Sequence, residues 1–195
     1  MVPSVISTPH YTLRRFSRRD LEALYEAVSA SLPELAVWLP WARPGYNRDD
    51  ALSFLRESIQ AWRDNRAFDY SIRRHGQLDR HIGNISIWTV SRSARTGEIG
   101  YWVRSDEISQ GIATEATARM LRLGFEQMHL HKVTLRIGVG NTASERVAAK
   151  LGFRSEGILR EELQVAGRWM DHTLFSLLDH EAVEMHVREA DQNRP

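Results

Sequence analysis

A run of small residues connects a strand-like segment to a long helical pattern, and the chain could bind an anion at this junction. Ser109, Gly111 and Ala113 alternate with larger residues within Ser105–Ala116. Small side chains let backbone N–H groups approach a ligand closely, and a helix N-terminus adds partial positive charge. The junction therefore indicates a pyrophosphate-type anion site, although tight packing alone explains small residues at such a turn equally well.

A second motif, Asn141–Phe153, follows the most regularly alternating segment of the chain, Lys132–Val139. Asn141 is a strong helix N-cap residue, and Gly152 is suited to ending the helix with Phe153 packed back against it. Taken alone, this motif predicts a capped amphipathic helix and nothing more. This motif follows a strand directly, and the two motifs together are far more specific than either one alone.

The elements that must position these motifs alternate between strands and helices around one irregular stretch, 33–46, which holds three of the six prolines. The order predicts an α/β (α+β) fold in which helices cover a mixed sheet, with a right-handed crossover between two parallel strands. Periodicity places strands at 11–15, 68–74, 81–90, 98–104 and 132–139, a hairpin at 154–165 and 168–178, and helices starting near Ser17, across 52–62, over 111–128 and after Asn141.

Composition narrows the class of protein. The 195 residues carry 26 Lys+Arg against 25 Asp+Glu, so the global charge expected of a nucleic-acid binder is absent. Cys is absent, which excludes disulfides and thiol catalysis. No segment reaches the roughly 18 apolar residues of a membrane span, and no signal peptide is evident. We therefore expect a soluble, cytoplasmic, single-domain protein with its core at about 10–180 and a polar tail at 181–195.

Taken together, the motifs resemble a known family over roughly 12–178. Ser109–Ala116 resembles the acyl-CoA pyrophosphate loop of the GNAT N-acetyltransferases, and Asn141–Phe153 is similar to their N-x-x-S…K-L-G-F helix. Further segments are similar to the RimJ/RimL branch, the ribosomal-protein N-terminal acetyltransferases. These segments are Glu98–Trp102, Trp38–Trp41, Arg154–Arg160 and Gly167–His172.

The resemblance implies a mixed sheet of roughly seven strands and about four helices, whose central parallel strands splay apart to admit acetyl-CoA as cosubstrate. No metal is expected. The acetyl group would pass directly to a bound amine without an acyl-enzyme. The residues implied for holding acetyl-CoA are the backbone amides of Gln110, Gly111, Ile112, Ala113 and Thr114, with the Asn141 side chain against the pantetheine arm.

The chemistry requires a neutral amine and a stabilised tetrahedral oxyanion. The family pattern makes Glu98 the candidate base, and an exposed strand-end carboxylate is the alternative. Backbone N–H groups near Trp102 and Val103 would bind the oxyanion. Ser144 is the candidate general acid, unless its hydroxyl only bonds its own helix backbone. Trp38 and Trp41 could form a wall of the acceptor pocket or simply pin their loop onto the core.

Several positions depart from the family pattern. Ile108 and Ser109 stand where the loop usually opens with Gln or Arg and then Gly, and Ala148 replaces a helical tyrosine that protonates the thiolate in many members. A hairpin glutamate that serves as base in the RimL branch corresponds to Leu163. Glu162 is adjacent and is expected to face the opposite side of its strand.

We expect an N-acetyltransferase that acts on a peptide or protein N-terminal α-amine. At pH 7 an α-amine with a pKa of about 8 is roughly 10% neutral, whereas a lysine amine is neutral well below 0.1%, a difference of about 3 kcal/mol. The alternatives are a small-molecule amine acceptor, such as a polyamine or an aminoglycoside, and a catalytically weak acyl-CoA-binding sensor. A homodimer is possible because relatives often dimerise.

Overall fold

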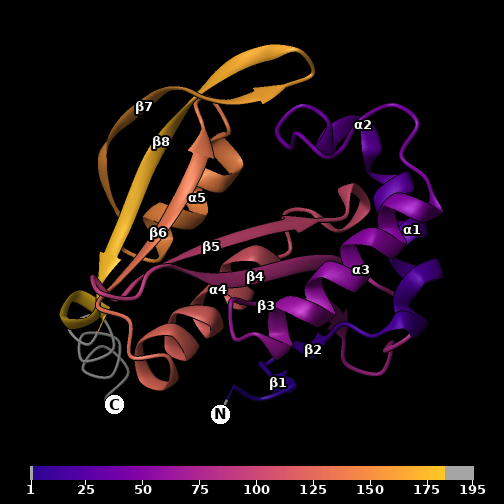
Figure 1. The fold of residues 1–195 in the computed structure, drawn as a ribbon, viewed down its shortest axis with the longest axis horizontal. Coiled ribbons are helices and arrows are strands. Elements are labelled where there is room, and N and C mark those ends of the chain that lie inside the picture. Colours follow the sequence, from indigo (N-terminus) through magenta and orange to yellow (C-terminus); the bar gives the residue numbers. More distant parts are fainter. Residues whose placement is uncertain (1, 183–195) are drawn as a thin grey trace.

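A computed structural model describes residues 2–182 of the chain. Eight strands form one mixed sheet in the order β1-β2-β3-β4-β5-β6-β8-β7 (Figure 1). The strands are β1 (Val5–Ser7), β2 (Tyr11–Arg15), β3 (Ala67–Arg74), β4 (Gly83–Ser91), β5 (Thr96–Val103), β6 (Lys132–Gly138), β7 (Arg154–Val165) and β8 (Arg168–Leu178). The expected mixed α/β architecture is confirmed, and the hairpin has the bounds that its alternation predicts.

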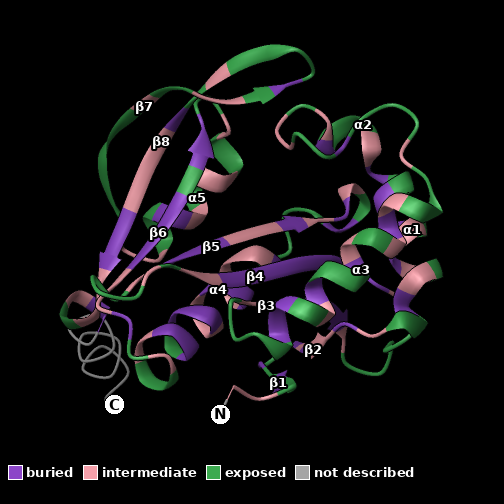
Figure 2. Ribbon diagram, viewed as in Figure 1, coloured by how far each residue is buried: buried purple, intermediate pink, exposed green. Residues whose placement is uncertain are grey.

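Helices cover both faces of this sheet. The α-helices are α1 (Leu21–Ala30), α2 (Leu32–Leu35), α3 (Arg48–Arg63), α4 (Ile112–Arg122) and α5 (Thr142–Lys150), with short helical turns η1 (Arg18–Asp20), η2 (Ser105–Glu107) and η3 (Leu123–Gln127). Figure 1 shows α3 in front of β3 and β4, with α4 behind them. Burial is concentrated in the central strands, whereas β7 and its turn are largely exposed (Figure 2).

The central parallel strands β5 and β6 pair over three residues only, from Thr96↔Lys132 to Glu98↔Thr134. Beyond that point β5 continues to pair with β4 as far as Val103, and β6 with β8 as far as Gly138. Each strand thus follows its own antiparallel partner, and the two diverge. The splay implied by the family resemblance is confirmed.

The structure also differs from the expected elements. β1 adds an eighth strand; its three residues are too few for a period-2 pattern to reveal. The irregular stretch at 33–46 starts inside α2, a four-residue helix. The helix expected over 111–128 is α4 followed by the π-helical turn η3. The expected polar tail lies mostly outside the described residues.

A buried polar chain ties the N-terminal segment to β5. Asp20, which is 4% exposed, accepts hydrogen bonds from Arg14 and from Arg73, the latter at 2.8 Å. Arg73 Nε donates to Ser71 Oγ at 2.9 Å, so the Ser71 hydroxyl is left to donate to His81 Nδ1 at 2.7 Å. Burial lowers the pKa of His81 to about 3, so this ring is neutral. Its edge meets the Trp102 ring at 5.3 Å between centroids, which fixes the end of β5.

We predict that Asp20→Asn destabilises the fold by about 3–5 kcal/mol, because it leaves the buried Arg73 guanidinium without its counter-charge. Glu22→Gln is the matched control: Glu22 also pairs with an arginine, Arg48, but both side chains are more than half exposed, so solvent screens this pair and its loss should change stability little. Urea unfolding at pH 7 measures both. Equal losses in the two variants would contradict the assigned role of the buried pair.

The same carboxylate gives this stability a pH dependence. Burial opposes ionisation of Asp20, but hydrogen bonds from Ser17 and Arg14 outweigh it and lower its pKa. The contribution is therefore complete above the unfolded-state pKa and is lost as the pH falls through the lower folded-state value.

Candidate active site

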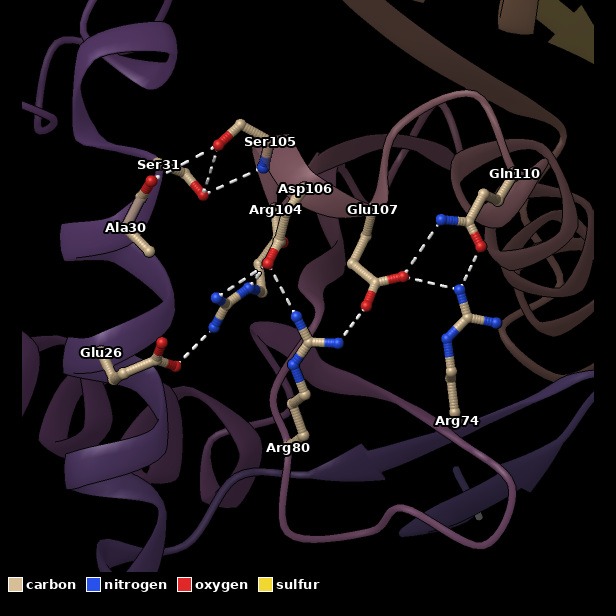
Figure 3. A network of polar contacts seen from close by, with 10 residues as sticks. All are labelled: Glu26, Ala30, Ser31, Arg74, Arg80, Arg104, Ser105, Asp106, Glu107 and Gln110. Atoms are coloured by element: carbon tan, nitrogen blue, oxygen red, sulfur yellow. Dashed lines mark hydrogen bonds and ion pairs between the residues drawn. The ribbon is translucent and has the colours of Figure 1, made fainter.

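The loop that leads from β5 into α4 is clamped by ion pairs before the helix begins (Figure 3). Glu107, only 5% exposed, accepts a hydrogen bond from Arg74 at the end of β3 at 2.6 Å, and it also contacts Arg80. Burial opposes ionisation of this carboxyl, but the two guanidiniums outweigh it and lower its pKa. An ionised Glu107 therefore anchors the loop to the β3–β4 connection.

The start of the loop is fixed to the first helix layer. Arg104 pairs with Glu26 of α1 and, at 2.9 Å, with Asp106. The Ser105 backbone N–H donates to Ser31 Oγ at 3.0 Å. Figure 3 shows these contacts along the loop, with Arg80 joining Asp106 to Glu107. The chain thus enters α4 from a fixed position.

The loop itself turns through left-handed backbone at two residues. Ser109 has φ +63° and Gly111 has φ +78°. Ser109 thus keeps the left-handed turn that glycine makes at this position in the family, and the left-handed conformation costs an L-residue about 1–2 kcal/mol. Gly111 is the N-cap of α4 without a side-chain cap, and a Cβ there would meet nothing within 4 Å.

First-turn amides of a helix lack intrahelical acceptors, so those of Ile112, Ala113 and Thr114 remain as donors. At Gln110 the side chain is held by Arg74 and Glu107, and the carbonyl accepts from the Tyr11 hydroxyl at 3.3 Å. The predicted anion loop thus presents backbone N–H donors at the start of α4.

The second motif forms α5 as expected. Asn141 Oδ1 accepts the Ser144 backbone N–H at 3.2 Å, which is the predicted N-cap. Within residues 2–182 the Ser144 hydroxyl makes no hydrogen bond to its own helix backbone. Ala148 lies on the buried side of α5 and is fully buried.

Tyr101 is a site residue that sequence reasoning missed. Its hydroxyl is buried and has no partner of good hydrogen-bond geometry among the residues that the structure describes. Burial raises its pKa, and the neighbouring Ser144 hydroxyl partly opposes this rise. A buried, unsatisfied hydroxyl beside Ser144 marks a place where a ligand atom would supply the missing bond. Only the fold brings β5 and α5 together here.

Glu98 lies on the opposite face of β5 from Tyr101, because side chains alternate along a strand. It is 8% exposed and accepts a hydrogen bond from Arg136 Nε of β6 at 2.9 Å. Burial raises the pKa of Glu98, and Arg136 only partly opposes the rise. Glu98 is therefore neither an exposed strand-end carboxylate nor a free one.

Arg136 also joins Glu162 of β7, with Nη1 to Oε1 at 2.6 Å. Strict alternation predicts that Glu162 and Leu163 face opposite sides of β7. The register of β7 shifts between Leu159 and Leu163, with Glu161 at φ +51°. At this bulge Glu162 reaches Arg136, which also contacts Glu98. A bulge leaves no periodic signal, so the Glu98–Arg136–Glu162 cluster could not be foreseen.

A cavity of about 460 Å³ lies on this face, where β5 and β6 begin to diverge. One carboxylate and two cationic side chains contribute to its wall. Its lining residues are Trp88, Val90, Thr96, Glu98, Lys132, Thr134, Arg136 and Leu174.

The two predicted acceptor tryptophans lie at the far ends of the diverging strands. Trp41 contacts Trp102 at the end of β5, with ring centroids 6.3 Å apart. The Trp38 ring covers Gly138 at the end of β6, where an added Cβ would lie 3.1 Å from it. Trp41 is 42% exposed, so it is not simply buried in the core.

The hydrogen bonds between β4 and β5 show which of the two predicted oxyanion donors, the amides of Trp102 and Val103, points toward the gap between β5 and β6. Arg104 N–H donates to the Ile82 carbonyl of the chain entering β4. Antiparallel hydrogen bonding alternates, so the Trp102 amide is also directed at β4, opposite Asn84. The Val103 amide points to the other side, toward the gap between β5 and β6.

The comparisons with known proteins agree with this geometry. The family described as "Acetyltransferase (GNAT) domain" matches residues 10–154. The chain belongs to this family of acetyltransferases, and the expected enzyme class, an acetyl-CoA-dependent N-acetyltransferase, is confirmed at that level.

Among its relatives, the chain is 31% identical to "Putative ribosomal N-acetyltransferase YdaF" of Bacillus subtilis, over 88% of this chain and 93% of that protein. It is 24% identical to the ribosomal-protein-serine acetyltransferase of Escherichia coli, over 76% of this chain and 82% of that one. Among solved structures, RimJ of Mycobacterium smegmatis in complex with CoA-disulfide has a TM-score of 0.84 at 28% identity, covering 97% of this chain and 95% of that chain.

Two further observations concern the described part of the chain, residues 2–182. It contains no helix long and apolar enough to cross a membrane. It also brings no three His, Asp or Glu side chains together as a metal site. His131, one of the two histidines near the end of the 111–128 pattern, instead pairs with Asp179 at 3.2 Å.

Proposed function

We propose that the enzyme acetylates the α-amino group of a protein or peptide N-terminus, as the names of its ribosomal-protein acetyltransferase relatives suggest. The observation that carries this choice is the single carboxylate, Glu98, in the lining of the cavity. The two cations of that lining are already paired, Lys132 with Glu156, and Arg136 with Glu98 and Glu162. A lone glutamate base deprotonates an α-amine with a pKa of about 8 far more readily than an alkyl amine with a pKa of about 10.4, which favours a peptide N-terminus over a polyamine.

The residues present fit acetyl-CoA. Its pyrophosphate would be held by the backbone amides of Gln110, Gly111, Ile112, Ala113 and Thr114 at the start of α4, where a Cβ added at Gly111 would meet nothing within 4 Å. The Asn141 side chain would contact the pantetheine arm beside α5. The unsatisfied Tyr101 hydroxyl marks where the thioester end would lie. When bound, this cosubstrate supplies an activated acetyl group.

On the acceptor face, Glu98 would remove the proton from the ammonium, directly or through a water. Its raised pKa makes it a better base than an exposed glutamate. The Val103 amide, directed into the gap, would donate to the oxygen that develops negative charge. Ser144 would protonate the departing thiolate from the other face, next to Tyr101. Trp38 and Trp41 would form the wall that positions the peptide.

The acceptor is tested by a mass-shift screen with isotope-labelled acetyl-CoA. We expect ribosomal-protein N-terminal peptides to gain one acetyl group at the α-amine, and the same peptides with a formylated N-terminus and an internal lysine to gain none. Spermidine and an aminoglycoside serve as competing acceptors. Labelling of these alone would contradict the α-amine proposal. Tight CoA binding without thiol release on any amine would favour the sensor alternative.

We predict that Glu98→Gln lowers kcat/KM by about 10²–10⁴-fold at pH values above the pKa of Glu98. The wild-type rate should fall as the pH drops through that raised pKa, because the base becomes protonated. The variant should lack this acidic limb. Glu126→Gln, at the exposed end of the α4 region, is the control and should leave the profile unchanged.

The same pH–rate profile tests the competing carboxylate. If Glu162→Gln removes the acidic limb while Glu98→Gln retains it, the base is Glu162 and the assignment of Glu98 is wrong.

We predict that Ser144→Ala slows kcat tenfold or more, equivalent to at least about 1.4 kcal/mol. Thr142→Ala, an exposed change in the same helical turn, should have no such effect. With a thioester whose thiol is more acidic, the departing thiolate needs less protonation, so the Ser144→Ala defect should shrink. A defect of equal size with both thioesters, or none at all, would remove Ser144 from the proton-donor role.

A further inference from the structure

A second cavity, of about 670 Å³, opens at the edge of the sheet between β2, η1 and α3. In the sheet order β3 and β4 separate β2 from β5, so this cavity is distinct from the splay of β5 and β6. Figure 1 shows β2 and α3 on the opposite side of the sheet centre from β6 and α5. The proposed acetyl transfer leaves this cavity unused.

Five arginines from three elements line the cavity, and no Asp or Glu does. β2 contributes Arg14 and Arg15, η1 contributes Arg18, and α3 contributes Arg56 and Arg63. Arg56 and Arg63 are seven residues apart, so they lie on one stripe of the helix. The chain as a whole has a net charge of only +1, so the fold concentrates positive charge here.

Carboxylates elsewhere do not neutralise this charge. Arg14 contacts Asp20, but that carboxylate is shared with the buried Arg73. Arg18, Arg56 and Arg63 form no ion pair with any residue in the range 2–182.

Two of the guanidiniums are held in place before any ligand arrives. The Asp20 contact orients Arg14. The Arg15 guanidinium stacks over Trp62, 4.8 Å from the ring centre. Asp64, at the end of α3, is occupied by Gln60 and Arg66. The cavity therefore presents two positioned guanidiniums, one of them paired with Asp20, beside three arginines that form no ion pair within residues 2–182.

Planar guanidinium forks match the oxygens of phosphate groups and bind them bidentately. Neutralising several guanidiniums in one cavity requires several negative charges close together, which linked phosphates supply. Val5, Phe16 and Ile59 add apolar surface beside the arginines. The volume lies within the range of small-molecule sites, about 300–1,000 Å³. We propose that this arginine cavity binds a soluble small molecule carrying two or more linked phosphate groups.

The test measures binding of tripolyphosphate and of ATP by calorimetry without CoA, because the pyrophosphate of CoA would compete for the cavity. We expect a saturable site that is weakened at least tenfold in Arg18→Gln/Arg56→Gln, whereas binding at the α4 loop should be unchanged in this variant. Both arginines are exposed, so the fold should tolerate the change. The matched control, Arg92→Gln/Arg168→Gln, removes the same charge from exposed positions outside this cavity and should bind like the wild type.

The proposal is overturned if neither probe binds, or if both double variants lose affinity equally, which would indicate only a general charge effect. It is also overturned if single-stranded RNA or a glutamate-rich peptide binds through Arg18 and Arg56 while tripolyphosphate and ATP do not. None of these readouts depends on acetyl transfer, so failure here leaves the proposed function standing, and failure of that function leaves this result interpretable.

Discussion

The site depends on one constraint: β5 and β6 share only three paired positions before they separate. A strand must satisfy its backbone hydrogen bonds somewhere, and each strand does so on its outer side, β5 with β4 and β6 with β8 over its whole length. The inner edges beyond Glu98 and Thr134 are therefore left without a strand partner. The Val103 amide is available for chemistry because of this divergence, and the cavity beside Glu98 opens where it begins.

The alternation of side chains along β5 divides the chemistry between two faces of the sheet. Glu98 and Tyr101 are an odd number of residues apart, so they lie on opposite faces of one strand. Glu98 faces the cavity between β5 and β6 with Arg136, whereas Tyr101 faces α5 and Ser144. In the proposed mechanism, the amine would be deprotonated on one side and the thiolate protonated on the other. A strand at the edge of a gap is suited to this, because both faces reach the same opening.

Sequence reasoning predicted what local patterns encode. The helical start near Ser17, the Asn141 cap and the final hairpin all form as expected, because each depends on neighbours within a few residues. The splay came from the family resemblance and not from periodicity. The Glu98–Arg136–Glu162 cluster was missed because it joins three strands through a bulge. Tyr101 was missed because its relation to Ser144 exists only after β5 and α5 meet. Site chemistry that depends on long-range contacts is invisible to a pattern of residue types.

The Arg136 bridge explains how a buried glutamate can be kept at a useful basicity. Burial alone favours the neutral acid, and a dedicated arginine partner would hold the carboxylate ionised and weakly basic. Arg136 divides its guanidinium between Glu98 and Glu162, and the negative charge of Glu162 further raises the pKa of Glu98. The second carboxylate thus weakens the hold of the cation on the first. Glu162 acts on Glu98 through their shared partner, so this residue beside the bulge in β7 would help to tune the proposed base.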